Sequence, residues 1–232
     1  MPHSGAVVDC DEVTKVYRQG TQEVHALRGL TLEVAAGEFT AICGPSGSGK
    51  TTLLNLIGAL DRPSAGAIRL EGRDLGAMGQ RERSHLRRDR IGFVFQAYNL
   101  MPVLTAYENA EMVISLQGVA DDERRRRVLA VLADVGLEGL EDRRPDELSG
   151  GQQQRIAIAR AIAPDPAVVL ADEPTANVDS ETSETLLEIM EKLNRDHGVT
   201  FLFSTHDPAV MARAHRLVKM VDGQVAEDTV RS

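Results

Sequence analysis

The sequence predicts an α/β fold whose core of strands and helices carries an antiparallel β sheet near the N-terminus and an inserted helical lobe. Three observations predict it. Apolar and polar residues alternate over residues 7–34, a glycine-rich loop lies at 44–51 between an apolar run and a helical pattern, and apolar residues recur at helical spacing over 107–163. With 232 residues the chain is long enough for one such domain with a lobe, and two domains are also possible.

Composition narrows the class of protein. The net charge is -9, from 26 Lys plus Arg and 35 Asp plus Glu, which argues against a general nucleic-acid binder because such binding depends on basic charge. Cys10 and Cys43 lie in no C-x-x-C motif, so neither a zinc site nor a disulfide framework is indicated, and a reducing cytosol fits. Residues 1–5 lead into no apolar segment, and the longest apolar runs fall far short of about 18 residues. We therefore expect neither export nor membrane spanning.

The N-terminal region predicts two paired strands. Residues 7–16 and 24–34 have strand-like patterns, and the second ends at a turn over 35–37. Between them, Tyr17 precedes the turn 18–20, where it could present its ring to a purine; the alternative is an ordinary tyrosine at a strand end.

The glycine-rich loop is the sharpest motif in the chain. It follows the apolar run 39–43, a buried strand by its pattern, and precedes a helix start at 52–57. All fixed positions of the phosphate-binding pattern G-x-x-x-x-G-K-[ST] are present. The loop reads Gly44-Pro45-Ser46-Gly47-Ser48-Gly49-Lys50-Thr51.

The residue types of this loop suit a phosphate chain. Gly47 and Gly49 allow many N–H donors to approach the anion without side chains in the way, and a helix opening near Gly49 aims its positive end at it. Lys50 can reach the outer phosphates, and the hydroxyl of Thr51 can ligate magnesium. The alternative is a Gly-Ser turn before a helix.

The next segment predicts a hairpin around 67–72 and a buried strand over 91–95 that ends at Gln96. A polar amide at the carboxyl end of a strand lies where α/β sheets place their ligands. The alternative is a glutamine that merely ends the strand.

The helical lobe predicts helices over 106–117, 121–135 and 150–163. In the second, acids at 121–123 precede the arginines at 124–127, which suits the helix dipole and pairing one turn apart; a solvated face is expected, and a partner or lipid contact is the alternative. Before the third, Leu148-Ser149-Gly150-Gly151-Gln152 combines an N-cap serine with two glycines that expose backbone donors, so it could hold a second phosphate or serve only as a cap.

The apolar run 167–171 reads as a central parallel strand that ends in two carboxylates. In nucleotide hydrolases with such a loop, an aspartate here holds magnesium and the adjacent glutamate orients or deprotonates the attacking water, which assigns these roles to Asp172 and Glu173. A polar strand end that starts a turn is the alternative.

The C-terminal part predicts a helix over 180–194, a buried strand over 199–203 and a hairpin formed by 216–221 and 224–227. His206 follows the strand. An isolated histidine in this place is more often structural than functional.

Together these residues closely resemble the nucleotide-binding subunit of ATP-binding cassette transporters, over nearly the whole chain from Val7 to about Glu227. The motifs occur in that family's order, and several spaced matches are far harder to obtain by chance than one. The matches are residues 44–51 with the Walker A motif, Gln96 with the Q-loop, 148–152 with the LSGGQ signature, 168–172 with Walker B, Glu173 with the catalytic glutamate, 176–179 with the D-loop and His206 with the switch histidine.

The resemblance implies a single ABC ATPase domain over residues 1–232. Its P-loop NTPase (RecA-like) core and β subdomain would comprise 1–96 and 164–232, and its helical subdomain 97–163. Mg-ATP is the implied ligand. The implied catalytic residues are Glu173, His206, Gln96 and Lys50, and the implied metal contacts are Thr51, Gln96 and Asp172. The implied nucleotide contacts are Tyr17, which would stack on adenine, Ser46, Gly47, Ser48, Gly49, Lys50, Thr51, Thr52, Ser149, Gly150, Gly151, Gln152 and Asp179.

The resemblance also implies partners. ATP would lie between the Walker A motif of one subunit and residues 149–152 of another in a head-to-tail homodimer, so a lone chain is half of two sites. A separate integral membrane permease would hold the chain on the cytoplasmic face of the cell membrane, with membrane contact only through that permease. Residues 97–108 are the expected docking surface, because Pro102 interrupts helix formation in an apolar cluster; burial under the lobe is the alternative. The cluster consists of Tyr98, Leu100, Met101, Val103 and Leu104.

Within the family, residues 96–109 are similar to the macrolide-export, lipoprotein-release and cell-division branch. The D-loop departs from the family pattern, with Ala176-Asn177-Val178 where Ser-Ala-Leu is common, while Asp179 is kept.

Two other functions share this ATPase pattern. A chromosome-maintenance or DNA-repair ATPase would carry long coiled-coil heptads, but Gln96 and Leu148 lie only 52 residues apart. A ribosome-associated factor normally has two cassettes in one chain, whereas this chain has one P-loop and one signature. By the same resemblance, the permease would handle the cargo, and transport direction follows from analogy alone.

Overall fold

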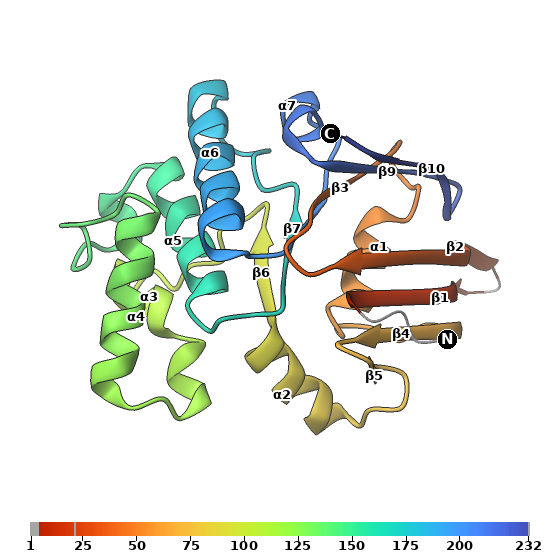
Figure 1. The fold of residues 1–232 in the computed structure, drawn as a ribbon, viewed down its shortest axis with the longest axis horizontal. Helices are drawn as coiled ribbons and strands as arrows, with labels where there is room; N and C mark the ends of the chain where they lie inside the picture. Colours follow the sequence, from red (N-terminus) through yellow and green to blue (C-terminus); the bar gives the residue numbers. More distant parts are fainter. Residues whose placement is uncertain (1–4, 21, 232) are drawn as a thin grey trace.

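The computed structural model describes residues 5–20 and 22–231, which form two sheets with helices packed around them (Figure 1). The first sheet is antiparallel, with strand order β2-β1-β4-β5. It confirms the predicted N-terminal sheet, and the predicted hairpin at 67–72 completes it. Its strands are β1 (Ala6–Gln19), β2 (Gln22–Ala35), β4 (Ala65–Leu70) and β5 (Arg73–Asp74).

The second sheet has strand order β10-β9-β3-β8-β7-β6. Strands β9, β3, β8, β7 and β6 run parallel, and β10 pairs antiparallel with β9 in the predicted C-terminal hairpin. All five residues of β3 are buried, as expected of a central strand covered on both faces. The strands are β3 (Phe39–Cys43), β6 (Ile91–Phe95), β7 (Val168–Asp172), β8 (Phe201–Ser204), β9 (Arg216–Val221) and β10 (Gln224–Val230).

The helices outside the lobe are α1 (Lys50–Ile57), α2 (Gln80–Arg90), α6 (Ser180–His197) and α7 (Pro208–Arg213). The sequence patterns predicted α1 and α6, although α6 continues three residues beyond the predicted end. They missed α2, in which Leu86 is the one buried side chain, so no apolar stripe marks it. They also missed α7, which has only six residues.

The lobe consists of α3 (Ala106–Glu111), η1 (Ile114–Gln117), α4 (Asp121–Asp134), η2 (Pro145–Glu147) and α5 (Gly150–Ile162). The prediction of one continuous helix over 106–117 is wrong: the α-helix ends after Glu111, and a tighter 3₁₀ turn follows. This turn buries Ile114 completely, and the β-branched pair Val113 and Ile114 also favours helix less than straight side chains do.

The basic run at the start of α4 pairs with acids of the lobe. Glu123 accepts from Arg126 and Arg127, at the predicted spacings of three and four residues, and Arg124 reaches Glu111 of α3 at 2.5 Å. These contacts account for the charges as local pairing on a solvated helix face.

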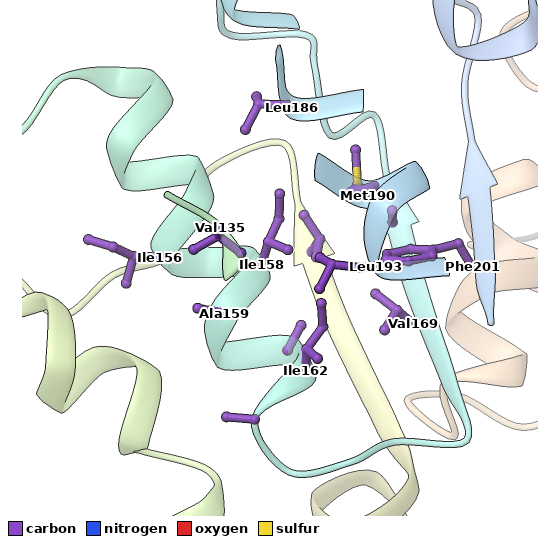
Figure 2. Packing of buried hydrophobic residues seen from close by; sticks show 14 of the residues in the cluster. Val135, Ile156, Ile158, Ala159, Ile162, Val169, Leu186, Met190, Leu193 and Phe201 are labelled. Carbon is purple, nitrogen blue, oxygen red and sulfur yellow. The ribbon is translucent and has the colours of Figure 1, made fainter. Parts of the chain in front are cut away.

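The hydrophobic core lies on the two faces of the second sheet. One cluster joins the lobe, α6 and strands β7 and β8, where Ile158 of α5 and Met190 of α6 pack with Phe201 and their neighbours (Figure 2). The other joins α1, the first sheet and the opposite face. Apolar side chains therefore pack on both faces of the second sheet, and polar residues such as Asp172 and Ser204 stand at the ends of its strands.

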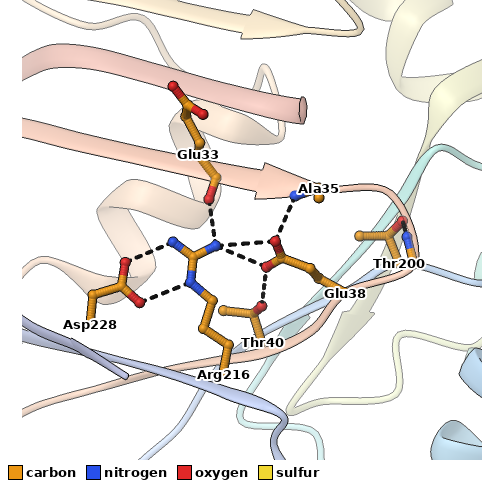
Figure 3. A network of polar contacts seen from close by, with 8 residues as sticks. Glu33, Ala35, Glu38, Thr40, Thr200, Arg216 and Asp228 are labelled. Atoms are coloured by element: carbon orange, nitrogen blue, oxygen red, sulfur yellow. Dashed lines mark hydrogen bonds and ion pairs between the residues drawn. The ribbon is translucent and has the colours of Figure 1, made fainter. Parts of the chain in front are cut away.

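A guanidinium links the two sheets. Arg216 of β9 donates to both carboxylate oxygens of Asp228 on β10, at 2.8 and 2.7 Å, and to the main-chain carbonyl of Glu33 on β2 at 2.7 Å (Figure 3). It also contacts Glu38 at 2.9 Å, just before β3. The hydrogen bonds from Arg216 hold the pKa of Asp228 below its usual range.

Candidate functional site

The strand register gathers the predicted site at one edge of the second sheet. Asp172 lies opposite Phe95 on one side and Ser204 on the other, and Ser204 lies opposite Ile42. The segments that follow these parallel strands therefore emerge side by side: the glycine-rich loop, Gln96, Glu173 and His206. This is the arrangement that the sequence predicted for them.

The glycine-rich loop leads directly into α1, which begins at Lys50. Gly47 has φ +81°, a conformation that favours glycine. Gly49 has φ +99° and also presses against β2, because a Cβ there would lie 2.5 Å from the carbonyl oxygen of Ala26. Gly49 is thus required by packing as well as by access to a phosphate.

The Lys50 ammonium donates to two carbonyls of its own loop, Gly44 at 2.8 Å and Pro45 at 3.1 Å. These two bonds hold the Lys50 ammonium against the first residues of its own loop. Thr52, the second residue after Lys50, is half-buried in the first turn of α1.

Thr51 and Asp172 come together as the sequence predicted. The Thr51 hydroxyl donates to the Asp172 carboxylate at 3.3 Å, although the two residues are 121 positions apart. The pKa of Asp172 is raised, mainly because the carboxyl is buried and to a smaller extent because the negative charge of Glu173 is nearby. One hydroxyl and one carboxylate form the donor set that magnesium uses when phosphates and waters supply its other ligands, so these residues fit that ion. No group of three or more His, Cys, Asp or Glu side chains forms a separate metal cluster within residues 5–20 and 22–231.

Glu173 and His206 are in direct contact. The His206 Nδ1 lies 2.7 Å from the Glu173 Oε1, and the main-chain N–H of Glu173 donates to the Ser204 carbonyl at 2.9 Å. Glu173 is largely buried, whereas the His206 side chain is 77% exposed and can move away from it. Glu173 also has φ +49°, which is uncommon for a residue with a side chain.

The signature segment opens α5. Ser149 is its N-cap: its hydroxyl accepts from the N–H of Gln152, and the Gln152 side chain accepts from the N–H of Ser149 at 2.9 Å. The predicted cap is confirmed. Across the described part of the chain, no hydrogen bond joins residues 148–152 to the loop at 44–51, so one chain does not bring these two phosphate-binding motifs together.

The two glycines of the signature have a second role that the sequence patterns missed. A Cβ on Gly150 would lie 2.9 Å from the Tyr98 hydroxyl, and one on Gly151 would lie 2.4 Å from the Thr182 Cγ2. Thr182 is held in place because Asp179, the N-cap of α6, accepts from both its N–H and its hydroxyl. These hydrogen bonds lower the pKa of Asp179.

Tyr17 is fixed by partners that the sequence reasoning did not identify. Its hydroxyl donates to Asp61 at 2.9 Å, and the Lys15 ammonium lies over its ring, 4.7 Å from the centroid. Lys15 also donates to Asp61 at 2.8 Å. Partial burial and the bond to Asp61 raise the pKa of Tyr17. The strand period of two could have indicated that Lys15 shares a face with Tyr17, but nothing local indicates Asp61.

Gln96 meets the D-loop segment. Asn177 donates to the Gln96 main-chain carbonyl at 2.9 Å, and the Gln96 side-chain amide lies 3.4 Å from the Asn177 Oδ1. The sequence reasoning noted Asn177 only as a departure from the family pattern.

The expected docking cluster divides into two parts. Leu100 is partly buried and packs against the core, which favours the alternative of burial under the lobe for that residue. Met101 and Val103 are exposed, by 46% and 69%. A groove of about 430 Å³ opens between α2, β6 and the lobe, and Asn99, within the stretch that carries this cluster, is one of its lining residues. The others include Phe93, Phe95, Met112, Val113, Leu116, Arg87 and Arg160.

Comparison with known proteins decides the family. A family model described as ABC transporter matches residues 27–176, more than half of the chain. The chain belongs to the ABC transporter family. As an ATP-binding cassette it is an ATPase of this family, and its α/β fold with the antiparallel sheet is the fold of such cassettes.

Curated relatives place the cassette in the predicted branch. It is 45% identical to a macrolide export ATP-binding/permease protein MacB of Syntrophobacter fumaroxidans, over 96% of this chain and 32% of that protein. It is 43% identical to the lipoprotein-releasing system ATP-binding protein LolD of Chromohalobacter salexigens, over 96% and 94%. The cassette spans about a third of the length of the MacB relatives, whose names include a permease.

Solved structures agree in fold. The cassette MJ0796, described as dimeric in a post-hydrolysis state with ADP and Pi, has a TM-score of 0.87 and 41% identity, with 97% of this chain and 99% of that chain covered. MJ0796 comes from Methanocaldococcus jannaschii. The protein cbiO1 of Clostridium perfringens, described as part of the ABC transporter complex cbiONQ, has a TM-score of 0.89 and 29% identity, with 98% of this chain and 89% of that chain covered. In the described part of this cassette, no helix has the length and apolar character needed to cross a bilayer.

Proposed function

We propose that this cassette hydrolyses Mg-ATP at the interface of a head-to-tail homodimer and thereby drives a separate membrane permease of the macrolide-export or lipoprotein-release type. The observation that carries the proposal is the grouping of Lys50, Thr51, Asp172 and Glu173 at one sheet edge, while the signature at 149–152 stays apart from them. A second copy would supply the missing half. The dimeric MJ0796 structures and the names of the relatives support this reading.

The nucleotide contacts follow from the loop. Ser46, Gly47, Ser48 and Gly49 offer main-chain N–H groups to the phosphates, Lys50 offers its charge, and Thr51 and Thr52 follow at the start of α1. Thr51 and Asp172 would hold magnesium, with Gln96 contributing from the neighbouring strand end. When bound, magnesium neutralises charge that develops on the transferring phosphoryl group.

Glu173 acts on the attacking water. Its carboxylate would accept a proton from that water or orient it, which is the role of a general base. His206 holds the carboxylate at 2.7 Å, and its exposure leaves it able to turn toward the outer phosphate once nucleotide and partner are in place. Tyr17 would take the adenine on the ring face opposite Lys15.

The dimer completes each site. Ser149, Gly150, Gly151 and Gln152 of one subunit would meet the γ-phosphate bound by its partner, with the helix start of α5 supplying positive dipole. Asp179 would lie beside this interface at the start of α6.

The permease would dock on the exposed side chains of Met101 and Val103 and in the groove between α2, β6 and the lobe. Its lining is apolar except for Asn99 and three arginines, and two of these arginines, Arg87 and Arg160, form no ion pair with any described residue. Their guanidinium groups donate to main-chain carbonyls instead, and burial lowers the pKa of both. The occupant that fits is a short amphipathic helix of the permease with an apolar face and an acidic side chain.

We propose that residues 1–232 form one domain. Its catalytic core, with the β subdomain, comprises residues 1–96 and 164–232, and its helical subdomain comprises residues 97–163. The permease would place the cassette on the cytoplasmic face of the cell membrane.

A mixed dimer tests the composite site. In a Glu173→Gln background, which retains ATP, a subunit carrying Lys50→Ala is combined with one carrying Ser149→Arg. One of the two sites then carries both lesions and the other neither. We expect about one retained ATP per mixed dimer and about none in either parent dimer, measured by filtration with labelled ATP. Verified heterodimers that retain no ATP would overturn the head-to-tail arrangement.

A further inference from the structure

Three hydrogen bonds join two loops that lie about 80 positions apart in the sequence. Asn177 Nδ2 donates to the Gln96 carbonyl at 2.9 Å, Gln96 Nε2 donates to Asn177 Oδ1 at 3.4 Å, and the Tyr98 hydroxyl donates to the Asn177 carbonyl at 3.3 Å. The first two use both ends of the Asn177 amide. A side chain without an amide, such as the alanine common at this D-loop position, makes neither of them.

The segment that carries Gln96 is held from two sides. Arg160 of α5 donates to the carbonyls of Tyr98 and Asn99, at 2.8 and 2.6 Å, from within the protein. Asn177 holds Gln96 from the exposed side. Arg160 contacts only main-chain atoms beyond Gln96, so the Asn177 amide is the contact that reaches Gln96 itself.

The same loop cluster touches the start of the signature helix. The Tyr98 hydroxyl lies 2.9 Å from the position that a Cβ on Gly150 would take, and Asn177 lies two residues before Asp179, the N-cap of α6. A displacement of Asn177 would therefore break hydrogen bonds to both Gln96 and Tyr98.

We propose that Asn177 is a positioning residue for the ATPase reaction: its amide holds Gln96 in place beside Thr51 and Asp172, and so links the loop after β7 to the loop after β6. The inference rests on the metal-site role proposed above for Gln96. It adds a residue that the motif pattern does not contain. Asn177 itself touches neither nucleotide nor metal in this scheme.

Kinetics of Asn177→Ala, Gln96→Ala and the double variant test the link. We expect Asn177→Ala to lower kcat about tenfold, within the range for residues in direct contact, and to raise the magnesium concentration that gives half-maximal activity. The Kd for ATP without magnesium should stay within about twofold. The double variant should be no more than about twofold slower than Gln96→Ala, because in that background Asn177 has no Gln96 side chain left to position.

A second measurement does not depend on activity. Hydrogen exchange of a peptide covering residues 96–101, in the nucleotide-free monomer, should be faster in Asn177→Ala than in the wild type. Thr185→Ala is the matched control, since it removes one side-chain hydrogen bond to the main chain, to Glu181, within α6. That variant should change neither exchange at 96–101 nor kcat. Asn177→Asp keeps the size and an acceptor for Gln96 Nε2, but it loses the donor of the shorter bond and sets a carboxylate against the Gln96 carbonyl, so exchange at 96–101 should rise as in Asn177→Ala. A space-filling role would tolerate this substitution.

The outcomes separate this inference from the proposed function. If Gln96→Ala slows hydrolysis while Asn177→Ala leaves kcat and exchange unchanged, or if the two effects multiply in the double variant, the positioning role is overturned and the proposed ATPase site stands. If Gln96→Ala itself has wild-type kcat and magnesium dependence, the role proposed for Gln96 is overturned, and the positioning role with it.

Discussion

Glu173 combines an uncommon backbone conformation with two fixed contacts. A non-glycine residue at φ +49° costs on the order of 1 kcal/mol or more, which surrounding contacts must offset. Here the Ser204 carbonyl holds the main chain and His206 holds the carboxylate.

Glu173→Gln should therefore remove the base without removing the nucleotide site. We expect hydrolysis to fall by at least about 10²-fold, while ATP affinity measured by calorimetry stays within about threefold. Glu181→Gln, on the exposed first turn of α6, is the matched control and should keep wild-type turnover. Near-normal turnover of Glu173→Gln would exclude Glu173 as the base.

Lys50→Ala should fail at an earlier step. It removes the charge that meets the outer phosphates, a charge-assisted contact typically equivalent to about 10- to 100-fold in affinity. Calorimetric titration with ATP measures this directly, and Lys192→Ala on the exposed face of α6 controls for loss of a lysine elsewhere. An unchanged Kd would mean that the loop at 44–51 is only a structural turn.

Motif spacing predicted the residues that share the sheet edge, because parallel strand ends align once the strands are recognised. It could not predict Asp61 beside Tyr17 or Asn177 beside Gln96. These contacts join loops that no periodic pattern connects, and they depend on how the loops pack.

At the scale of elements, burial decided which helices the sequence could predict. Helix α6 has a continuous apolar stripe and was predicted, whereas α2 buries only Leu86 and was not. The break after Glu111 was missed because its apolar spacing fits a helix through η1; the complete burial of Ile114 in the tighter turn overrides that pattern.

The hydrogen bonds of Arg216 that link the two sheets make a pH-dependent contribution to the free energy of unfolding. The pKa of Asp228 is lowered from its usual value near 3.8, so its ion pair stabilises the fold above that value and the contribution is lost as pH falls below it. Asp228→Asn should cost about 1 kcal/mol at pH 7, a value reduced for the partial exposure of the pair, and progressively less below about pH 4.

Urea denaturation at pH 7 and pH 3 measures this difference. Glu227→Gln, on the same strand, controls for the loss of one negative charge and should show no comparable pH dependence. A cost for Asp228→Asn that is equal at both pH values would show that the carboxylate's charge is not the source of the stabilisation.

At the scale of the whole molecule, the proposed permease contact predicts a separation of coupling from catalysis. Val103→Asp places a charge on a side chain that is 69% exposed, so the isolated cassette should keep its ATP affinity and its Tm to within about 2 °C. ATPase stimulation by the co-reconstituted permease should be lost. Leu100→Asp is the contrasting variant, since Leu100 packs on the core and its replacement should lower Tm.

The permease comparison has two contradicting outcomes. If Val103→Asp lowers Tm as much as Leu100→Asp does, the apolar cluster at residues 98–104 belongs to the hydrophobic core and is not a docking surface. If Val103→Asp retains full stimulation, docking takes place on another surface.

The close approach of Gly151 to Thr182 affects how inactive copies of such a cassette can be recognised from their sequences. A side chain at Gly151 is excluded by the chain's own packing, before any nucleotide or partner arrives. A copy that had lost its catalytic activity would still be under selection to keep this glycine as long as it folded. Degenerate copies are therefore better recognised by a replacement at Glu173 than by the survival of Gly151.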